Sequence, residues 1–430
     1  MAPSRGLNCL RQARLHLQKP RQDVRRFSDF VSAVADPSNK YQVYTSRSPN
    51  PYLNLSIEHY LLQKSPADAT ILFLYTNRPS VIIGRNQNPW TEVNLGLLRN
   101  EQGILQNADH RVQLVRRRSG GGTVFHDEGN VNYSVIMPTA DFDRDKHAEM
   151  VARALRNLGV DKVRVNERHD IVVDKTVPGE GELPFKISGS AYKLTRLRSV
   201  HHGTCLLSSP NIGSISKYLR APGKPFIKAK GVESVSSRIM NVGMENAKFE
   251  GAVRHEFWKM YSHSKAMTVG RAEADVPEIK GGFEELMSED WIYGQTPQFE
   301  FSTSGFDGEN LGEKDIWRFP HGLELSFTAR NATIQSLSIK DGENFMVTSS
   351  AKDKKVHEIA DWDSVLAAPF KKSYVGKSRH KVQAQLAKSM NELFGAGSYD
   401  TGVGKGSLST EEDNYLGIEP DRIVEVEGLE

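Results

Sequence analysis

Four short segments between Lys162 and Leu207 constrain the fold of this chain more than any other feature. Each alternates apolar and polar residues with the period of two that a half-buried β-strand requires. The segments are KVRVN, HDIVVD, FKISGSAYKL and SVHHGTCLL. Because the connections between them are too short for a crossover helix, the strands must be largely antiparallel. The sequence therefore disfavours a doubly wound parallel sheet, and it predicts that KTVPGEGELP (175–184) forms the loop of a hairpin.

Helical patterns accompany these strands. PYLNLSIEHYLLQK (51–64) has Leu53, Ile57, Tyr60 and Leu61 at helical spacing. Further helices are expected at 90–103 and 147–159, and further strands at 70–77, 80–87, 112–118 and 130–137. The predicted fold class is α+β, a mixed and mostly antiparallel sheet with flanking helices.

A second, smaller α+β unit is expected towards the C-terminus. Hairpin patterns occur in WIYGQTPQFEF, DIWRFPHGLELSFTAR and ATIQSLSIKDG, and a closing helix in SRHKVQAQLAKSMNELFG. Changes in composition place a first domain at 41–265, a charged linker at 266–289 and the second domain at 290–396. The acidic tail at 397–430 is expected to be disordered.

Residues 1–40 differ in composition from the rest and are expected to lie outside the fold. Before Ser28, arginine and lysine greatly outnumber acidic residues, and the leucines from Leu7 to Leu17 give an amphipathic pattern. This composition is typical of a mitochondrial transit peptide, with RRFS (25–28) as a processing site. The mature protein is therefore expected in the mitochondrial matrix. A disordered basic tail, with a cytoplasmic location, is the alternative.

The overall composition argues against several classes of protein. The chain of 430 residues has 38% hydrophobic and 25% charged residues, as an ordinary soluble globular protein does. Its formal net charge of +3 gives no reason to expect a nucleic-acid partner, and apolar runs such as ILFLY (71–75) are too short to span a membrane. Cys9 and Cys205 lack metal-ligand spacing, which argues against a disulfide scaffold or a zinc finger.

The stretch RRRSGGGTVFHDEGN (116–130) is the strongest candidate for a binding site. Crowded arginines repel each other and consecutive glycines lose much entropy on ordering, so a bound anion would offset both costs. Ser119 and the glycine N–H groups add donors for a phosphate or carboxylate. The loop lacks the features of a P-loop, a dinucleotide fingerprint or an RNA-binding patch. For the glycines alone, a flexible hairpin turn is the alternative.

Two separated motifs resemble the signatures of the lipoate–protein ligase A family. They are RRRSGGGTVFHDEGNVNYS and KISGSAYK, the second followed by HHGTCLL. WIYGQTPQFEF resembles the start of that family's C-terminal accessory domain, so the resemblance covers residues 41–395. It implies the catalytic fold of biotin and lipoate ligases, which is like that of class II synthetases. It also implies ATP-dependent activation of lipoate or octanoate to acyl-AMP, followed by transfer to a lysine of a lipoyl domain.

The resemblance also implies roles for individual residues. Lys186 corresponds to the family's essential lysine, which contacts the acyl carboxylate and the adenylate phosphate. The residues expected to bind ATP or the adenylate are Arg118, Thr123, Val124, Phe125, His126, Asp170, Lys186 and Lys193. Those expected to bind lipoate are Arg118, Ser119, Gly120, Gly121, Gly122, Lys186 and His202. Asp170 would also help to place a magnesium ion. A histidine pair in one strand is more often structural, and that interpretation stays open for His201 and His202.

Two departures from the family pattern leave other functions open. His169 stands where the family usually has asparagine, and Lys193 where it often has arginine, so a bidentate contact to an anion is lost there. Some mitochondrial members act mainly as amidotransferases, which move a lipoyl or octanoyl group between carrier proteins without ATP activation. A non-enzymatic scaffold that binds nucleotide or lipoyl domains is a more remote alternative. Octanoyl transferases use a cysteine beyond the lysine, but Cys205 is expected to be a buried hydrophobe.

The expected partners are the lipoyl domains of 2-oxoacid dehydrogenase E2 subunits and the glycine-cleavage H protein. Such domains present their lysine on a tight turn, commonly with acidic residues nearby. A basic rim at Lys224, Lys228 and Lys230 is therefore a predicted docking surface, with a solvated loop as the alternative.

Overall fold

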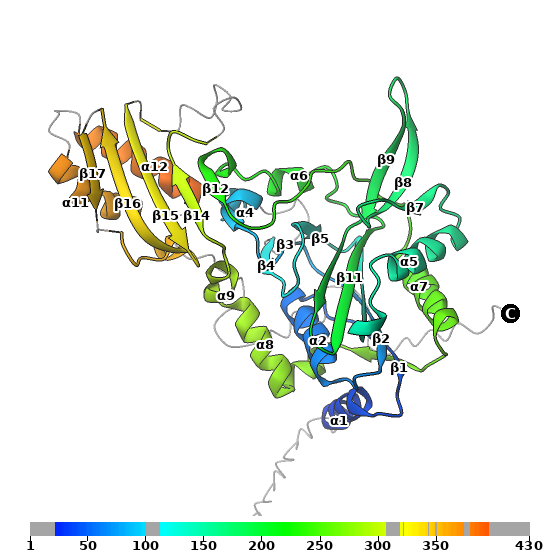
Figure 1. Ribbon diagram of the computed structural model, residues 1–430. Helices are drawn as coiled ribbons and strands as arrows, with labels where there is room; N and C mark the ends of the chain where they lie inside the picture. Colours follow the sequence, from blue (N-terminus) through cyan, green and yellow to red (C-terminus); the bar gives the residue numbers. More distant parts are fainter. Residues whose placement is uncertain are drawn as a thin grey trace, which may run out of the picture.

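The computed structural model describes residues 22–99, 112–306, 319–320, 322–342, 344–348, 351–373 and 379–394. Figure 1 shows two neighbouring parts: a larger one that contains most of the N-terminal half of the chain, and a smaller one built around a C-terminal sheet. The predicted tail at 397–430 lies outside the described residues.

A six-stranded mixed sheet forms the centre of the larger part. Its strands lie in the order β10 (Ser190–Leu194), β11 (Arg198–Leu206), β6 (Asn130–Pro138), β2 (Thr70–Thr76), β1 (Tyr41–Ser46) and β13 (Ala266–Val269). β1 runs parallel to β2 and β13, whereas β2, β6, β11 and β10 pair antiparallel. The predicted fold class, a mixed and mostly antiparallel α+β structure, is confirmed.

Helices bury both faces of this sheet. α2 (Pro51–Lys64) packs on one face, and α5 (Lys146–Asn157) and α7 (Asn246–Met260) pack on the other. Because side chains alternate along a strand, β2 sends Phe73 towards α2 and Leu72 towards α5 and α7. The predicted helix at 51–64 is confirmed: it begins with Pro51, and the Asn50 side chain accepts hydrogen bonds from two N–H groups of its first turn.

Two small sheets flank the central one and carry the motifs. One has the order β4 (Gln113–Arg116), β3 (Ser80–Ile83), β5 (Val124–His126), and the other β7 (Val163–Val165), β8 (Ile171–Val177), β9 (Gly181–Ser188). A hairpin is confirmed at 175–184, the projecting β8–β9 hairpin (Figure 1), but the predicted ten-residue loop is wrong, because the strands pair up to Val177 and Gly181 and leave only 178–180 as the turn. FKISGSAYKL was predicted as one strand, but the chain breaks at Gly189 and passes from β9 into β10 of the central sheet.

The smaller part is a five-stranded antiparallel sheet backed by two helices. Its strands lie in the order β12 (Ile227–Ala229), β14 (Phe299–Ser302), β15 (Leu323–Arg330), β16 (Thr333–Asp341) and β17 (Asn344–Thr348), and its helices are α11 (Trp362–Ser373) and α12 (Arg379–Phe394). Trp90 stacks on Tyr293 with ring centroids 5.5 Å apart and contacts Phe394, so one hydrophobic core extends through both parts.

Several elements differ from the sequence-based expectations. Residues 22–35 were expected outside the fold, but α1 (Gln22–Ala35) buries Phe30 and Val34 against the α2 side of the sheet. The helix expected at 90–103 is interrupted after α3 (Pro89–Glu92), because Val93 is extended and the Asn94 side chain caps α4 (Leu95–Arg99). The part of that prediction beyond residue 99 lies outside the described residues.

The segment 266–289, expected as a linker, belongs to the larger part. It contains β13, η4 (Arg271–Asp275) and α8 (Pro277–Met287), which packs on α2 through a 2.7 Å ion pair between Lys64 and Glu278. The hairpin expected in WIYGQTPQFEF is instead α9 (Glu289–Gly294) followed by β14, because Ser288 caps the Trp291 N–H. The remaining short elements are α6 (Ile215–Tyr218), η2 (Thr139–Asp141), η3 (Lys224–Phe226) and η5 (Val356–Glu358).

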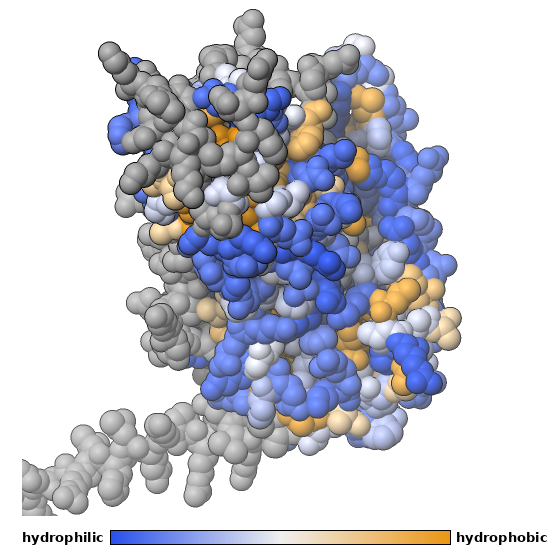
Figure 2. Space-filling view, turned by 60° about the vertical axis from the view of Figure 1, so that its left-hand side comes forward, coloured by the Kyte–Doolittle hydropathy of each residue, from blue (hydrophilic) through white to orange (hydrophobic). Residues whose placement is uncertain are grey.

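On the face shown in Figure 2, hydrophobic residues occur in small groups among hydrophilic ones. Among the described residues, no helix combines the length and the apolar character needed to cross a membrane.

Candidate active site

Lys186 lies where two sheets meet. It stands near the end of β9, three residues before the Gly189 break that leads into β10. A Cβ on Gly189 would come within 3.0 Å of Lys186 Cε, so the missing side chain lets the lysine lie across the backbone. The Lys186 ammonium forms an ion pair with Asp170, with 2.9 Å between Nζ and Oδ1. The structure thus brings together the predicted catalytic lysine and the predicted acidic residue.

A tight turn before β8 holds Asp170 in place. The Asn166 side chain accepts a hydrogen bond from the Asp170 N–H at 3.0 Å. His169 has a φ of 62°, a left-handed conformation that asparagine adopts readily, and its Nδ1 lies 2.6 Å from Asp145 Oδ1. The departure from the family pattern at His169 therefore affects the turn that positions Asp170.

Arg116 is a structural residue. It is fully buried, and its guanidinium donates to the carbonyls of Gly84, Arg85 and Gln87 and to Ile292 O and Thr296 Oγ1 of the C-terminal segment. The first arginine of the motif therefore joins the glycine loop to the segment around α9, and its charge faces backbone carbonyls.

Arg117 is also structural, because the glycine loop wraps around it. Its guanidinium donates to the carbonyls of Gly120 at 2.6 Å and Gly122 at 2.8 Å and to Ser119 Oγ at 3.0 Å. Gly121 takes a positive φ of 87° to complete the turn. The cost of ordering these glycines is thus partly offset inside the protein, which the anion argument from the sequence did not foresee.

Arg118 faces the site but is held by α8. Its guanidinium forms a 2.5 Å ion pair with Glu285 and lies over the Trp291 ring, 4.9 Å from the ring centroid. The arginine that is predicted to bind the substrate carboxylate is therefore already paired with a carboxylate of the protein, that of Glu285.

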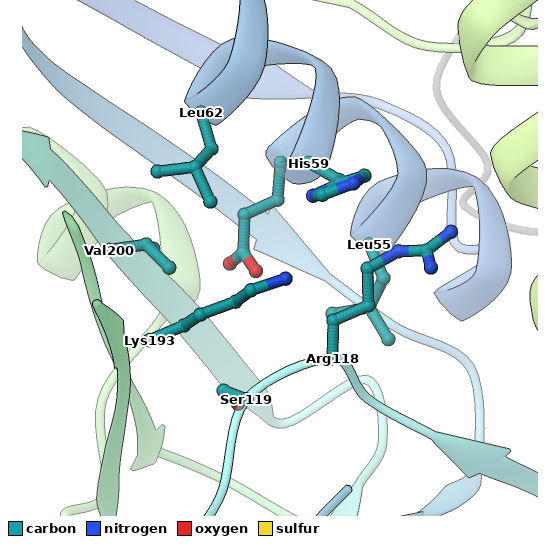
Figure 3. A pocket seen from close by; sticks show the side chains of 8 residues that line it. Leu55, His59, Leu62, Arg118, Ser119, Lys193 and Val200 are labelled. Atoms are coloured by element: carbon teal, nitrogen blue, oxygen red, sulfur yellow. The ribbon is translucent and has the colours of Figure 1, made fainter. Parts of the chain in front are cut away.

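A recess beside the glycine loop brings several predicted residues together (Figure 3). It is lined by Leu55, Glu58, His59, Leu62, Arg118, Ser119, Lys193 and Val200. α2 supplies apolar side chains, whereas the loop and β10 supply cations. Burial and the positive charges of Arg118 and Lys193 lower the pKa of His59 to about 4, and burial together with Arg118 and Arg85 lowers the pKa of Lys193. The recess pairs an apolar wall with cationic side chains, the combination that an acid with an apolar tail requires, in a space of about 10 Å³ that must widen to admit one.

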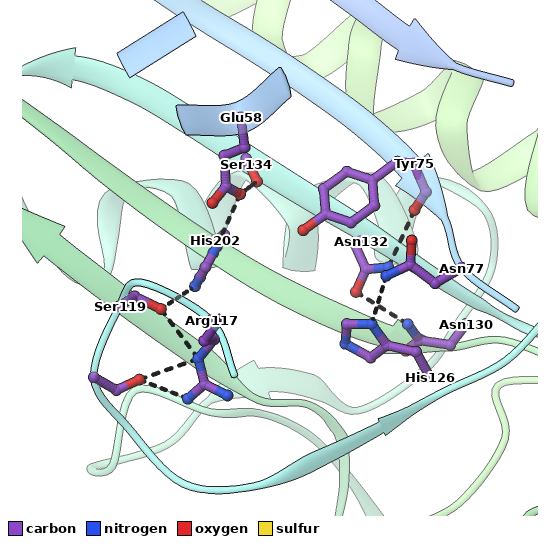
Figure 4. A network of polar contacts seen from close by, with 11 residues as sticks. Glu58, Tyr75, Asn77, Arg117, Ser119, His126, Asn130, Asn132, Ser134 and His202 are labelled. Carbon is purple, nitrogen blue, oxygen red and sulfur yellow. Dashed lines mark hydrogen bonds and ion pairs between the residues drawn. The ribbon is translucent and has the colours of Figure 1, made fainter. Parts of the chain in front are cut away.

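A buried polar chain links α2 to the glycine loop through β11 (Figure 4). Glu58 Oε2 lies 2.9 Å from His202 Nδ1, and His202 Nε2 lies 2.7 Å from Ser119 Oγ. The Ser134 hydroxyl donates to the same Glu58 oxygen. Sequence reasoning singled out Ser119 and His202 but missed Glu58. The available signal was weak: Glu58 is the single acidic residue of the predicted helix at 51–64, which the structure buries on nearly every side.

The side chains of the predicted nucleotide segment Thr123 to His126 are engaged with other parts of the protein. The Phe125 side chain stacks on Tyr218, and the His126 ring is buried 2.9 Å from the Asn77 amide nitrogen. Burial and Arg117 lower the pKa of His126 to about 3, so the ring is neutral. Thr123 N–H donates to Ser234 Oγ at 2.8 Å. Val124 lies near the Lys186 side chain, since a Cβ on Gly189 would be 3.9 Å from Val124 Cγ1.

Cys205 is unsuited to covalent catalysis. It is fully buried on β11, and burial raises the pKa of its thiol well above the ordinary range. This agrees with its expected role as a small hydrophobic residue.

Comparisons with known proteins identify the relatives of this chain. The family model of the lipoyl protein ligase A/B catalytic domain matches residues 50–252. The chain is 42% identical over 341 residues to the Schizosaccharomyces pombe protein "Putative lipoate-protein ligase A". The aligned region covers 74% of this chain and 86% of the relative. It is 32% identical over 286 residues to lipoate-protein ligase A of Bdellovibrio bacteriovorus, covering 62% of this chain and 77% of that protein.

A solved structure shares the arrangement less closely. The crystal structure of P. falciparum LipL1 in complex with lipoate aligns with 81% of this chain and 99% of its own length, at 23% identity and a TM-score of 0.48. The sequence relatives, which this chain matches over most of their length, are what decide the family. The chain belongs to the lipoate–protein ligase A family, whose members are ligase-class enzymes.

Proposed function

We propose that this protein activates lipoate or octanoate with ATP and transfers the acyl group to a lysine of a lipoyl domain. In the first step a carboxylate oxygen of the acid attacks the α-phosphorus of ATP, and pyrophosphate leaves. In the second, the lysine amine attacks the acyl carbon, an amide forms and AMP leaves. The observation that carries the proposal is the Lys186–Asp170 ion pair, at the break between β9 and β10, the strand that supplies Lys193 to the recess.

The charges of the site suit the first step. The acid and ATP are both anions, so their reaction requires fixed cations and N–H donors at the point where charge gathers. Lys186 supplies one cation, held in place by Asp170. Arg118 supplies another once the substrate carboxylate replaces Glu285, and Lys193 and Ser119 line the same recess. The backbone of Thr123 to His126 would hold the nucleotide.

Asp170 also fits a magnesium ion bound together with ATP. Magnesium in nucleotide sites needs only one or two protein carboxylates, because phosphates and water complete its coordination. Asp170 provides one carboxylate, next to the lysine that would contact the phosphate. The ion would neutralise phosphate charge there.

The partners and location follow from the same proposal. Lipoyl domains of 2-oxoacid dehydrogenase E2 subunits and the glycine-cleavage H protein would accept the acyl group, with the exposed Lys224, Lys228 and Lys230 as the docking rim. Lys224 pairs with Glu233 at 3.3 Å, and an acidic acceptor could exchange with that partner. The basic N-terminal segment supports a mitochondrial matrix location.

The decisive experiment measures pyrophosphate release with ATP, magnesium and lipoate and without any acceptor. Lys186→Ala should lower the lipoate-dependent rate by about 10²–10³-fold, as loss of one charge-stabilising donor does. Lys175→Ala, an exposed lysine on the same hairpin, is the matched control and should leave the rate unchanged. Absence of release, with acyl transfer still observed from a lipoylated carrier protein, would instead identify an amidotransferase.

A further inference from the structure

The chain Glu58–His202–Ser119 has the arrangement of a proton relay. All three side chains are buried, each at most 8% exposed, and Ser119 and Glu58 both line the recess that is proposed to bind the acyl group. Figure 4 shows the carboxylate, the imidazole and the hydroxyl in one line of hydrogen bonds. A structural role would require only that each polar group has a hydrogen-bond partner. The order carboxylate, imidazole, hydroxyl also allows a proton to move along the chain of hydrogen bonds.

The hydrogen bonds fix where the protons lie. Burial raises the pKa of Glu58, but the charge and hydrogen bond of His202 and the Ser134 hydroxyl outweigh it, so the pKa is lowered and Glu58 is ionised. A carboxylate only accepts hydrogen bonds, so His202 carries its proton on Nδ1. In the neutral ring, Nε2 is then an acceptor for the Ser119 hydroxyl. Because Arg117 Nε also donates to Ser119 Oγ, one oxygen lone pair is left for a donor in the recess.

Charged groups of both signs surround His202. The titratable and cationic groups around the chain Glu58–His202–Ser119 are His59 on α2, Arg117 and Arg118 at the glycine loop, Lys193 on β10, His126 on β5, Tyr75 on β2 and the adjacent His201. Glu58, in direct contact, is placed to be the counter-ion of the imidazolium once a proton arrives.

The second step of the proposed reaction needs such a proton acceptor. As the neutral lysine amine attacks the acyl-AMP carbonyl, the C–N bond forms and the bond from the acyl carbon to the phosphate oxygen breaks, with AMP leaving with the electron pair. The nitrogen then carries one proton more than the amide product. Lys186 is cationic, and Asp170 is engaged by it, so neither is a ready base.

We infer that Glu58 and His202, acting through Ser119, accept this proton during acyl transfer. The amine proton passes to Ser119 Oγ while the Ser119 proton passes to His202 Nε2, and the resulting imidazolium pairs with Glu58. His202 later returns the proton to water. Ser119 touches the substrate in this scheme, and His202 and Glu58 are positioning and proton-storing residues behind it. The inference rests on the proposed function.

The test is the pH dependence of single-turnover transfer from preformed lipoyl-AMP to an isolated lipoyl domain. The amine of the acceptor must be neutral, which alone gives a tenfold rise in rate per pH unit below its pKa of about 10.4. If a second group, the relay, must also be free of its extra proton, the logarithm of the rate rises with slope two at low pH and with slope one at higher pH. The wild-type profile should therefore show this break.

Variants decide whether the relay causes the break. His202→Gln and Ser119→Ala should give slope one throughout and a rate at least about 100-fold lower on the upper limb. Glu58→Gln should move the break to lower pH, since the imidazolium loses its counter-ion. Glu256→Gln is the control and should keep the wild-type profile. It removes a buried carboxylate of α7 that pairs with Arg153 of α5.

The outcomes separate the relay from the proposed function. A slower rate with an unchanged break in His202→Gln or Glu58→Gln would reduce these residues to a structural role and overturn the inference. A wild-type enzyme that transfers nothing from lipoyl-AMP would overturn the proposed function itself. If His202→Gln fails to fold, the shift of the break in Glu58→Gln carries the test.

Discussion

Replacing Arg116 by lysine should destabilise the whole molecule without removing a charge. The Arg116 guanidinium serves five acceptors, four carbonyl oxygens and Thr296 Oγ1, in a site closed to water. An ammonium has three donors, so at least two acceptors lose their partner. Each buried acceptor left unpaired costs about 1–3 kcal/mol, which gives a loss of about 2–6 kcal/mol in the free energy of unfolding.

Urea denaturation followed by tryptophan fluorescence measures this loss. Burial lowers the pKa of Arg116 to about 9, so the wild-type side chain is charged at neutral pH and the comparison is between two cations. Arg330→Lys, at an exposed position on β15, is the matched control and should change stability by less than about 0.5 kcal/mol. If the urea midpoint of Arg116→Lys equals that of the wild type, the hydrogen bonds of the guanidinium do not contribute to the stability of the fold.

Three further outcomes are expected. Burial holds the pKa values of His126 and His201 at about 3, well below the 6.5 of an unfolded histidine. Their contribution to stability is therefore fully present above pH 6.5, and each ring removes about 1.4 kcal/mol per pH unit from the free energy of unfolding as the pH falls towards 3. His201→Gln should flatten the fall in thermal midpoint measured below pH 6.5, and an unchanged slope would contradict the assignment. Glu285→Gln frees Arg118 from its ion pair and should lower the KM for lipoate severalfold in the pyrophosphate assay. A raised KM would mean that Glu285 positions Arg118 for the substrate. Cys205→Ala should retain acyl transfer in a gel-shift assay, because the thiol is buried and its pKa is raised; complete loss in a folded variant would restore a covalent mechanism.

The sequence predicted the parts of the fold that depend on local periodicity. The helix at 51–64 and the antiparallel strands of the motif region follow from side-chain spacing and connection length. The exceptions arise where one side chain changes the backbone locally. Asn94 starts a new helix inside the stretch predicted as one continuous helix, and Ser288 caps a helix where a hairpin was predicted. α1 is stabilised by packing of Phe30 against Tyr44 and Tyr60, which only the folded protein provides.

The site could be located from the sequence, but its internal partners could not. The motifs identified Lys186, and the pairing with Asp170 is observed, although the roles of both stay predictions. Spacing gave no sign that Arg116 would bind backbone carbonyls of segments distant in sequence, such as that of Ile292, or that the glycine loop would turn its own carbonyls onto Arg117. Glu58 was missed for the same reason, since its partner His202 lies 144 residues away along the chain.

Strands that are distant in the sequence pair with each other in both large sheets, and this has a consequence for how the protein is synthesised. β12 leaves the ribosome well before β14, its only pairing strand among the described residues, and one edge of β1 stays open until β13 is made. Apolar side chains such as Trp90 and Phe226, which belong to the shared core, stay uncovered during that interval. The nascent chain therefore exposes open sheet edges and apolar surface until its C-terminal part is made, which makes it a natural client for a chaperone. If the chain were cut between residues 265 and 266, β1 and β12 would be separated from β13 and β14, and both fragments would have open sheet edges. Both fragments are therefore expected to aggregate.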